Sequence, residues 1–215
     1  MDSTLKYYNQ NASQFVQETF SVDFKQTQDR FLVNLPAGAY ILVFGCGSGR
    51  DTKYFLEKGF QVDAIDGSEE LCKIACDYTG IKVKQMLFEE LHDVDKYDGI
   101  WACSSILHLS KPALAGVLKK MAAALKDNGV VYTSFKHGSF EGERNGRYFT
   151  DFTIGDFEKY LHRIPELQIE DYWITGDVRP GRDEEKWLNL ILRKKGIHYS
   201  LMENIIIHWI SSHFL

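Results

Sequence analysis

The stretch Ala39–Phe55, AYILVFGCGSGRDTKYF, constrains the fold more than any other part of the chain. A β-branched and aromatic run passes directly into a turn with glycine at every second position, and an amphipathic pattern follows. These patterns predict a strand, a tight turn and a helix. Strand-like and helix-like segments then alternate with little linker between them. This alternation is typical of α/β proteins with a parallel sheet.

The expected elements continue this alternation to the end of the sheet. The predicted strands cover residues 40–44, 61–65, 82–87, 98–103, 129–135, 167–175 and 187–193. The predicted helices cover residues 3–19, 24–33, 51–58, 68–77, 111–126 and 153–163. The polar segment DVRPGRDEE between the last two strands is too short for a parallel crossover, which needs a dozen residues or more. We therefore expect a Rossmann-like, doubly wound, mostly parallel seven-stranded sheet that ends in an antiparallel hairpin.

Composition limits the partners and the compartment. The chain of 215 residues has 44% hydrophobic residues and a formal net charge of −5, without a long Lys/Arg run, so nucleic acid is a disfavoured partner. We expect no membrane span, because no stretch of about 18 apolar residues occurs. The N-terminal segment lacks the pattern of a signal peptide, so we expect a cytoplasmic protein. The cysteines have no CxxC pair or histidine cluster, which predicts reduced thiols and no metal site at Cys46, Cys72, Cys76 and Cys103.

The glycine turn differs from a dinucleotide fingerprint, which needs glycine at its first, third and sixth positions. The sixth position here is Arg50. Backbone N–H groups at a helix N-terminus suit a small carboxylate or a ribose more than a buried pyrophosphate. Asp66 follows Gly45 by 21 residues, at the end of the second predicted strand, where a carboxylate can accept both ribose hydroxyls.

Residues 5–195 resemble the class I S-adenosylmethionine (SAM)-dependent methyltransferases of small molecules. The segments FGCGSGRDT, VDAIDGS and KDNGVVYTSFK, with the terminal hairpin, are similar to the tellurite-resistance type. The resemblance implies SAM as cofactor, S-adenosylhomocysteine (SAH) as product, an N-terminal helical lid over residues 1–38 and a SAM-binding domain over 39–195. Residues 196–215 fall outside the resemblance and show helical spacing; we expect this tail to pack on its own domain or to contact a partner, in a monomer or a homodimer.

The resemblance also implies a set of cofactor-binding residues after the first four strands. They are Gly45, Cys46, Gly47, Gly49 and Arg50, then Asp66, Gly67 and Ser68, then Met86, Leu87 and Phe88, and finally Cys103 and Ser104. Arg50 either meets the SAM carboxylate or forms a salt bridge in the first helical turn. The chain departs from the family at Val43 and Leu87, where acidic residues are usual. We expect Val43 to lie beside the SAM ammonium, and Val43→Asp to tighten SAM binding if the site is wet.

The acceptor is a small molecule by elimination. The fourth-strand segment CSSILHL has no Asn/Asp-Pro-Pro-aromatic motif and no paired glutamates, and the chain has no Pro-Cys nucleophile. His108 is a candidate general base with a pKa suited to neutral pH, or it packs against the following helix. Tyr8, in the segment YYNQNA, is a candidate cover for SAM and a candidate catalytic residue, or it belongs to a plain amphipathic helix.

The loops after the fifth and sixth strands leave from the carboxyl edge of the sheet and bring cations towards one mouth. These cations are Lys136, Arg144, Arg147, Arg179 and Arg182, with the aromatic residues Tyr148, Phe149 and Trp173 nearby. The composition suits an anionic acceptor. Acidic residues of the same loops would instead pair with these cations on the surface. The function predicted is methyl transfer from SAM; alternatives are a non-catalytic SAM sensor, a nicotinamide oxidoreductase, or an RNA or protein methyltransferase.

Overall fold

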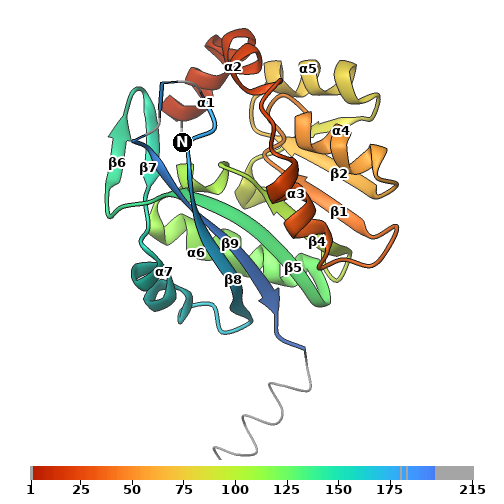
Figure 1. Ribbon diagram of the computed structural model, residues 1–215, viewed down its shortest axis with the longest axis vertical. Coiled ribbons are helices and arrows are strands. Elements are labelled where there is room, and N and C mark those ends of the chain that lie inside the picture. The colour runs from red at the N-terminus through yellow and green to blue at the C-terminus, as the bar shows by residue number, and fades with distance from the viewer. Residues whose placement is uncertain (1, 180, 183, 197–215) are drawn as a thin grey trace, which may run out of the picture.

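The computed structural model describes residues 2–179, 181–182 and 184–196. A seven-stranded sheet has the order β3-β2-β1-β4-β5-β9-β8 (Figure 1). The pairs among the first five strands are parallel, and β9 is antiparallel to both β5 and β8. The strands are β1 (Tyr40–Phe44), β2 (Gln61–Asp66), β3 (Val83–Gln85), β4 (Tyr97–Ala102), β5 (Leu125–Lys136), β8 (Leu167–Gly176) and β9 (Lys186–Lys194). The predicted mostly parallel sheet with an antiparallel hairpin is confirmed.

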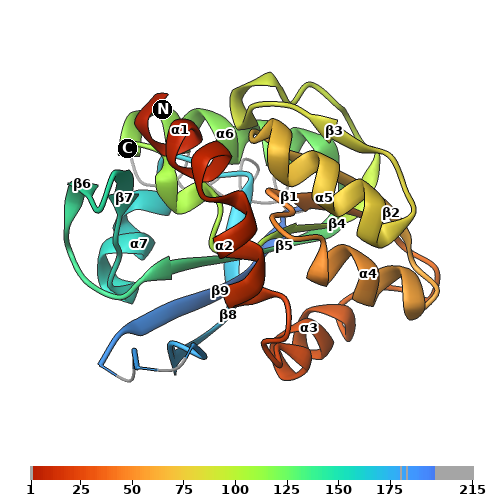
Figure 2. The same cartoon turned by 90° about the horizontal axis from the view of Figure 1, so that it is seen from above.

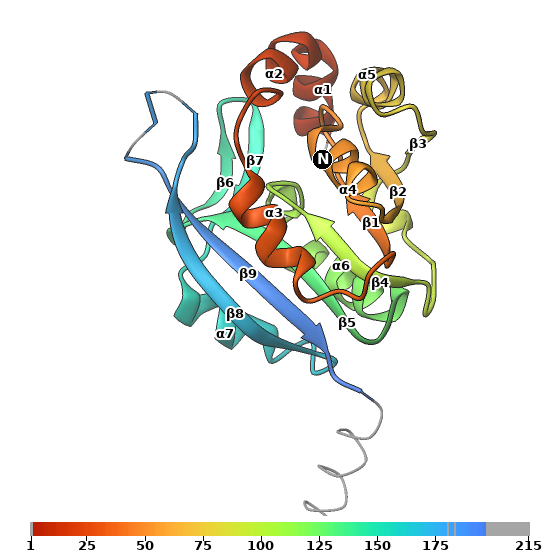
Figure 3. The ribbon, with the colours of Figure 1, turned by 45° about the vertical axis from the view of Figure 1, so that its right-hand side comes forward.

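Helices cover both faces of this sheet (Figures 2 and 3). They are α1 (Asp2–Gln10), α2 (Ala12–Thr19), α3 (Lys25–Leu32), α4 (Arg50–Glu57), α5 (Glu69–Thr79), α6 (Lys111–Ala124) and α7 (Ile154–Leu161). One core cluster contains residues of α3, α4 and α5 against the sheet, and the other contains residues of α6 and α7. Strand β1 contributes to both clusters, because its side chains alternate between the two faces.

The N-terminal helical pattern is divided, which corrects the single helix predicted over residues 3–19. The chain leaves helical geometry at Asn11, with φ −115° and ψ 17°. The Asn11 side chain donates from Nδ2 to the Tyr7 carbonyl at 2.8 Å, so it satisfies a carbonyl at the end of α1. Figure 3 shows α1 and α2 above the carboxyl edge of the sheet.

A second sheet, β6 (Glu141–Arg144) with β7 (Arg147–Thr150), occupies the segment that the sequence analysis treated as a loop. Asn145 and Gly146 join the two strands with φ +52° and +73°. Two consecutive positive φ values are those of a tight type I′ hairpin, for which Asn-Gly is the preferred sequence. The Asn-Gly pair was therefore a signal of this hairpin that the sequence analysis overlooked.

Other boundaries differ at the ends of elements. Strand β5 begins at Leu125, four residues before the predicted start, and β3 covers only three residues. Among the described residues, no helix combines the length and the apolar character needed to cross a membrane. The predicted tail helix lies outside the described residues, apart from Gly196.

Candidate functional site

One cavity lies at the carboxyl edge of the parallel strands, where the sequence predicts ligand binding. Its walls come from the lid helices α1 and α2, the turn after β1, the ends of β2, β3, β4 and β5, the β6–β7 hairpin and the segment between β8 and β9. The cavity therefore joins the predicted cofactor residues to the predicted acceptor residues.

The glycines of the turn after β1 lie in two different environments. Gly45, Cys46 and Gly47 line the cavity, and an added Cβ on Gly47 would lie 3.1 Å from the Phe15 ring of the lid. Gly49 does not line the cavity. It has φ +82° and faces α5, where an added Cβ would lie 2.9 Å from Thr79 Cγ2. Gly49 therefore packs between α4 and α5, and its predicted cofactor contact stays a prediction.

Asp66, at the end of β2, lies in the cavity wall and holds the glycine turn. Its Oδ2 accepts from the Gly47 N–H at 2.9 Å, and its Oδ1 accepts from the Ser68 N–H at 2.9 Å. Burial raises the pKa of Asp66, and these backbone N–H groups partly oppose the shift. Each carboxylate oxygen keeps a further lone pair for a ligand hydroxyl.

Ser68 does not line the cavity, although Asp66 and Gly67 do, and its predicted cofactor contact stays a prediction. Its hydroxyl accepts from the Leu71 N–H at 3.2 Å and caps α5. The same hydroxyl donates to Asn9 Oδ1 of the lid at 2.7 Å. Ser68 therefore fixes the lid helix α1 next to the end of β2.

The residues after β3 and β4 lie where the sequence analysis placed them. Met86, Leu87 and Phe88 line the cavity, as do Cys103 and Ser104. Ser104 has φ +50°, and its N–H donates to Ser134 Oγ at 2.9 Å. This bond ties the turn after β4 to β5.

The structure corrects the prediction that Val43 lies beside the SAM ammonium. Its side chain is 1% exposed, belongs to the core cluster of Phe31, Phe55 and Trp101, and does not line the cavity. Strand alternation directs it to the face covered by α3 and α4, so it does not border the cofactor side of the turn.

Arg50 forms the salt bridge that was the alternative to a SAM contact. Its Nε donates to Asp51 Oδ1 at 2.8 Å and its Nη2 to Asp51 Oδ2 at 3.0 Å. Asp51 also accepts from Gln28 Nε2 at 2.7 Å and from Trp101 Nε1 at 2.8 Å. Burial lowers the pKa of Arg50, but Asp51 raises it more, so the guanidinium stays charged. Both residues border the cavity as an internally paired unit.

Tyr8 of the lid and His108 of the short 3-10 helix η2 (Ile106–His108) form a hydrogen-bonded pair in the cavity wall. His108 Nδ1 lies 2.6 Å from the Tyr148 carbonyl oxygen, and His108 Nε2 lies 2.9 Å from the Tyr8 hydroxyl. A carbonyl only accepts, so Nδ1 carries the proton and Nε2 accepts from Tyr8. Both ring nitrogens of His108 thus have partners.

Burial determines the protonation of this pair. It lowers the pKa of His108 to about 4. The positive charge of Arg147 adds to this shift, and the hydrogen bond to the Tyr148 carbonyl opposes it. The predicted pKa suited to neutral pH is therefore wrong, because a buried imidazolium is poorly solvated. Burial raises the pKa of Tyr8, although Arg147 lowers it in part. At neutral pH both groups are uncharged.

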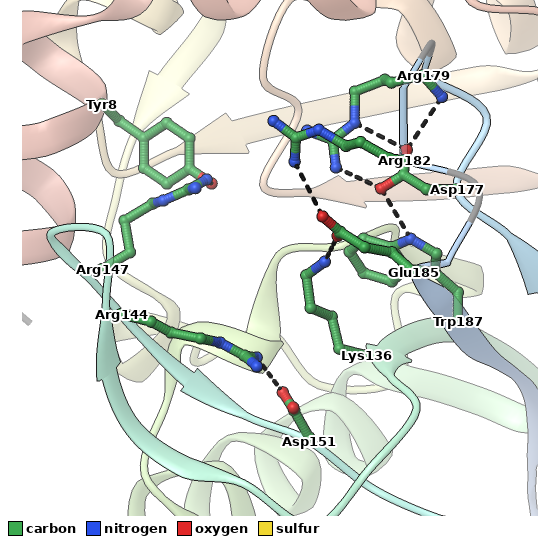
Figure 4. A network of polar contacts seen from close by, with 10 residues as sticks. All are labelled: Tyr8, Lys136, Arg144, Arg147, Asp151, Asp177, Arg179, Arg182, Glu185 and Trp187. Carbon is green, nitrogen blue, oxygen red and sulfur yellow. Dashed lines mark hydrogen bonds and ion pairs between the residues drawn. The ribbon is translucent and has the colours of Figure 1, made fainter.

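The predicted cations lie around the other end of the cavity, and most have a carboxylate partner (Figure 4). Lys136, Arg147, Arg179 and Arg182 line the cavity, whereas Arg144 does not. The ion pairs are Arg179 Nη2 with Asp177 Oδ2 at 2.5 Å, Arg182 Nη1 with Glu185 Oε1 at 3.8 Å, Arg144 Nη2 with Asp151 Oδ1 at 2.5 Å, and Lys136 with Glu185.

The pKa shifts in this cluster follow from burial and charge. Burial and the neighbouring cations lower the pKa of Lys136 to about 8, despite Asp177 nearby. Burial alone would raise the pKa of Asp177, but the hydrogen bonds from Arg179 lower it to about 2. Asp177 therefore remains an anion and compensates Arg179.

Two of the aromatic residues predicted near the cations, Tyr148 and Trp173, do not line the cavity. The Tyr148 side chain does not line the cavity, and its hydroxyl donates to Glu141 Oε1 at 3.1 Å. Strand alternation in β7 directs Arg147 and Phe149 into the cavity instead. Trp173 also lies outside the cavity wall, where Arg30 stacks on its ring at 3.9 Å.

Several cavity residues were not predicted. They include Thr4, Leu5, Phe15, Ser48, Asp51, Ser134, Thr175, Asp177, Trp187 and Asn189. The Asn-Gly turn would have indicated which residues of β7 share a face. No local pattern marks Phe15 or Trp187, because their place in the wall depends on segments that are distant in sequence.

Comparison with known proteins agrees with this geometry. Residues 41–129, from β1 into β5, match a family described as a methyltransferase domain. YqeM of Bacillus subtilis (strain 168), a candidate methyltransferase, is 27% identical over 139 residues, which cover 61% of this chain and 54% of that protein. The chain thus spans about half the length of this curated relative.

Solved structures extend the likeness beyond the matched domain. The 1,6-didemethyltoxoflavin-N1-methyltransferase of Burkholderia thailandensis, with 1,6-didemethyltoxoflavin and SAH bound, has a TM-score of 0.71 at 22% identity, over 89% of this chain and 85% of that chain. The magnesium protoporphyrin IX methyltransferase ChlM of Synechocystis PCC 6803, with bound SAH, has a TM-score of 0.67 at 19% identity, over 88% and 97%. The fold is the class I methyltransferase fold. The domain match agrees with the predicted enzyme class, and these two structures, each with SAH bound, share the fold of this chain.

Proposed function

We propose that this protein is a methyltransferase that transfers a methyl group from SAM to a small anionic molecule in the cytoplasm. The observation that carries the proposal is the single cavity that joins the glycine turn and Asp66 to a cationic end beneath the lid. The acceptor, the monomeric or homodimeric state and the closer resemblance to tellurite-resistance-type enzymes remain predictions.

The residues at the first end of the cavity fit SAM. The approach of Gly45 and Gly47 to the cavity leaves backbone exposed to a ligand at the N-terminus of α4, a position that suits a carboxylate. Asp66 retains acceptor capacity for ribose hydroxyls. Met86, Leu87 and Phe88 provide an apolar wall for adenine.

SAM supplies an electrophilic methyl group on a sulfonium, and the protein aligns the acceptor with it. Tyr8 and His108 can accept a proton when the acceptor loses one. The acceptor proton passes to the Tyr8 oxygen, the Tyr8 proton passes to His108 Nε2, and the imidazolium later releases a proton to water. The low pKa of His108 favours this release and also makes the imidazole a weak base, so the relay suits an acceptor atom that becomes positively charged, and therefore acidic, on methylation.

A non-catalytic SAM sensor is the second candidate. It is favoured by His108, because both ring nitrogens already have partners and its pKa is about 4. A nicotinamide oxidoreductase is disfavoured by Arg50 at the sixth position of the turn, where a dinucleotide site needs glycine. RNA or protein as acceptor is disfavoured by the lid, which supplies Tyr8 and Phe15 to the cavity wall.

Calorimetric titration with SAM, SAH and NADH tests the cofactor. We expect SAM and SAH to bind and NADH to give no heat. Asp66→Ala should lose about 1.5–3 kcal/mol of SAM binding, the range for hydrogen bonds to a charged group. Asp77→Ala, on the exposed face of α5, is the matched control and should bind SAM as the wild type does. Equal affinity in the two variants would contradict the cofactor role of Asp66.

Turnover separates the enzyme from the sensor. SAH release should be followed with the small-molecule fraction of a cell extract, with RNA and with protein as methyl acceptors. We expect SAH to accumulate only with the small-molecule fraction. Binding of SAM without SAH release from any fraction would favour the sensor.

A further inference from the structure

Charge compensation divides the five cations of the β6–β7 hairpin and the neighbouring loops into two groups. Four of them, Lys136, Arg144, Arg179 and Arg182, have a carboxylate within an ion-pair distance. Their carboxylates are Asp151, Asp177 and Glu185, the last of which Lys136 and Arg182 share, so the attraction of these four cations for a ligand anion is reduced but not cancelled. Figure 4 shows three of them, Lys136, Arg179 and Arg182, clustered with Asp177 and Glu185, away from Arg147.

Arg147 has no carboxylate partner among the residues that the structure describes. Its Nη1 donates to the Tyr8 hydroxyl at a long 3.4 Å, and its Nε is buried without a hydrogen-bond partner in the described chain. Aromatic rings surround its guanidinium, with the centroid of Tyr7 at 4.4 Å and that of Phe149 at 5.2 Å. Arg147 is half-buried, and a buried N–H donor without a partner is costly, so this arrangement suits an anion supplied from outside the protein.

We propose that Arg147 binds a carboxylate of the acceptor, so that the acceptor is a small planar carboxylate; this inference rests on the proposed methyltransferase function. The planar guanidinium matches the two oxygens of a carboxylate in a fork, and the cavity-lining rings of Tyr8 and Phe149 provide aromatic walls for a flat molecule. The single guanidinium of Arg147, which lies apart from the other cavity cations, matches one carboxylate.

The position of Arg147 assigns this carboxylate to the acceptor. Arg147 extends from the β6–β7 hairpin after β5, whereas the predicted SAM contacts follow β1, β2, β3 and β4. Its guanidinium also contacts the Tyr8 hydroxyl, which bonds to His108. A carboxylate on Arg147 would therefore hold the acceptor beside the pair that can take its proton.

Benzoate and its neutral isostere benzamide are suitable probes. Both should be titrated by calorimetry into the full chain, alone and saturated with SAH. We expect benzoate to bind at least about tenfold more tightly than benzamide, and Arg147→Gln to remove this difference with SAH affinity within about twofold of the wild type. Arg147→Lys, which keeps the charge and loses the fork, should retain only part of the preference. Arg163→Gln, at an exposed arginine of the α7–β8 connection, is the matched control and should behave as the wild type.

Two outcomes would overturn the inference. Undiminished preference for benzoate in a folded Arg147→Gln variant would place the anion site elsewhere. A loss of SAH affinity in that variant, with benzoate and benzamide equal in the wild type, would assign Arg147 to the carboxylate of the cofactor. Failure of the proposed function is distinguishable, because the wild type would then either not bind SAH or release no SAH with any acceptor fraction, whereas the benzoate comparison on the protein alone would still test Arg147.

Discussion

Gly49→Ala tests whether the third glycine of the turn packs against α5 or contacts the cofactor. Gly49 has φ +82°, and a Cβ would lie 2.9 Å from Thr79 Cγ2 and 3.3 Å from the Ala75 backbone. The left-handed conformation costs a non-glycine residue about 1–2 kcal/mol, and overpacking adds about 1–3 kcal/mol. We therefore expect the free energy of unfolding to fall by about 2–5 kcal/mol.

Gly59→Ala is the matched control. Gly59 follows α4 with φ +85°, and nothing lies within 4 Å of an added Cβ. The same backbone cost applies without the steric contact, so the expected loss is about 1–2 kcal/mol. The difference between the two variants isolates the packing of Gly49 against α5.

The assay is urea unfolding monitored by circular dichroism, with SAH titration of the folded proteins. Folded Gly49→Ala protein should keep its SAH affinity within a few-fold, because Gly49 does not line the cavity. Equal stability losses in the two variants would refute the packing argument. Equal losses together with a weakening of SAH binding by about tenfold or more would restore the cofactor contact that the resemblance implied.

Two further predictions concern buried groups. Burial lowers the pKa of His108 to about 4 in the folded protein, whereas histidine in an unfolded chain has an ordinary pKa of about 6.5. The unfolded chain therefore binds its proton first, and stability falls as the pH decreases from about 6.5 towards 4. Urea unfolding of wild type and His108→Gln should show that the wild type loses about 2 kcal/mol more between pH 7 and pH 5; parallel losses would contradict the low pKa. Val43→Asp should lower the free energy of unfolding by about 3–5 kcal/mol, because it places a carboxylate without a partner in the core. Unchanged stability with tighter SAM binding would show instead that residue 43 reaches the cofactor.

Local signals were sufficient for most of the fold. The alternation of strand and helix patterns predicted the sheet, and the short DVRPGRDEE linker predicted that β8 and β9 are antiparallel. The β6–β7 hairpin was missed although Asn145–Gly146 marks it, because the polar strands around that turn lack a clear hydrophobic alternation. This omission also led to the error at Tyr148, since only a strand directs Arg147 and Phe149 to one face and Tyr148 to the other.

The sequence by itself determined the glycine turn, the place of Asp66 after β2 and the edge of the sheet where the cavity lies. Each depends on the local backbone and on the direction of consecutive strands. Only the tertiary structure decided which cations have partners, which way Val43 faces and what the pKa of His108 is. Tyr8 and His108 are separated by 100 residues, and Arg147 and Tyr8 by 139. Burial and charge pairing at such separations depend on how the lid, the hairpin and the sheet pack together, and a local pattern does not record that packing.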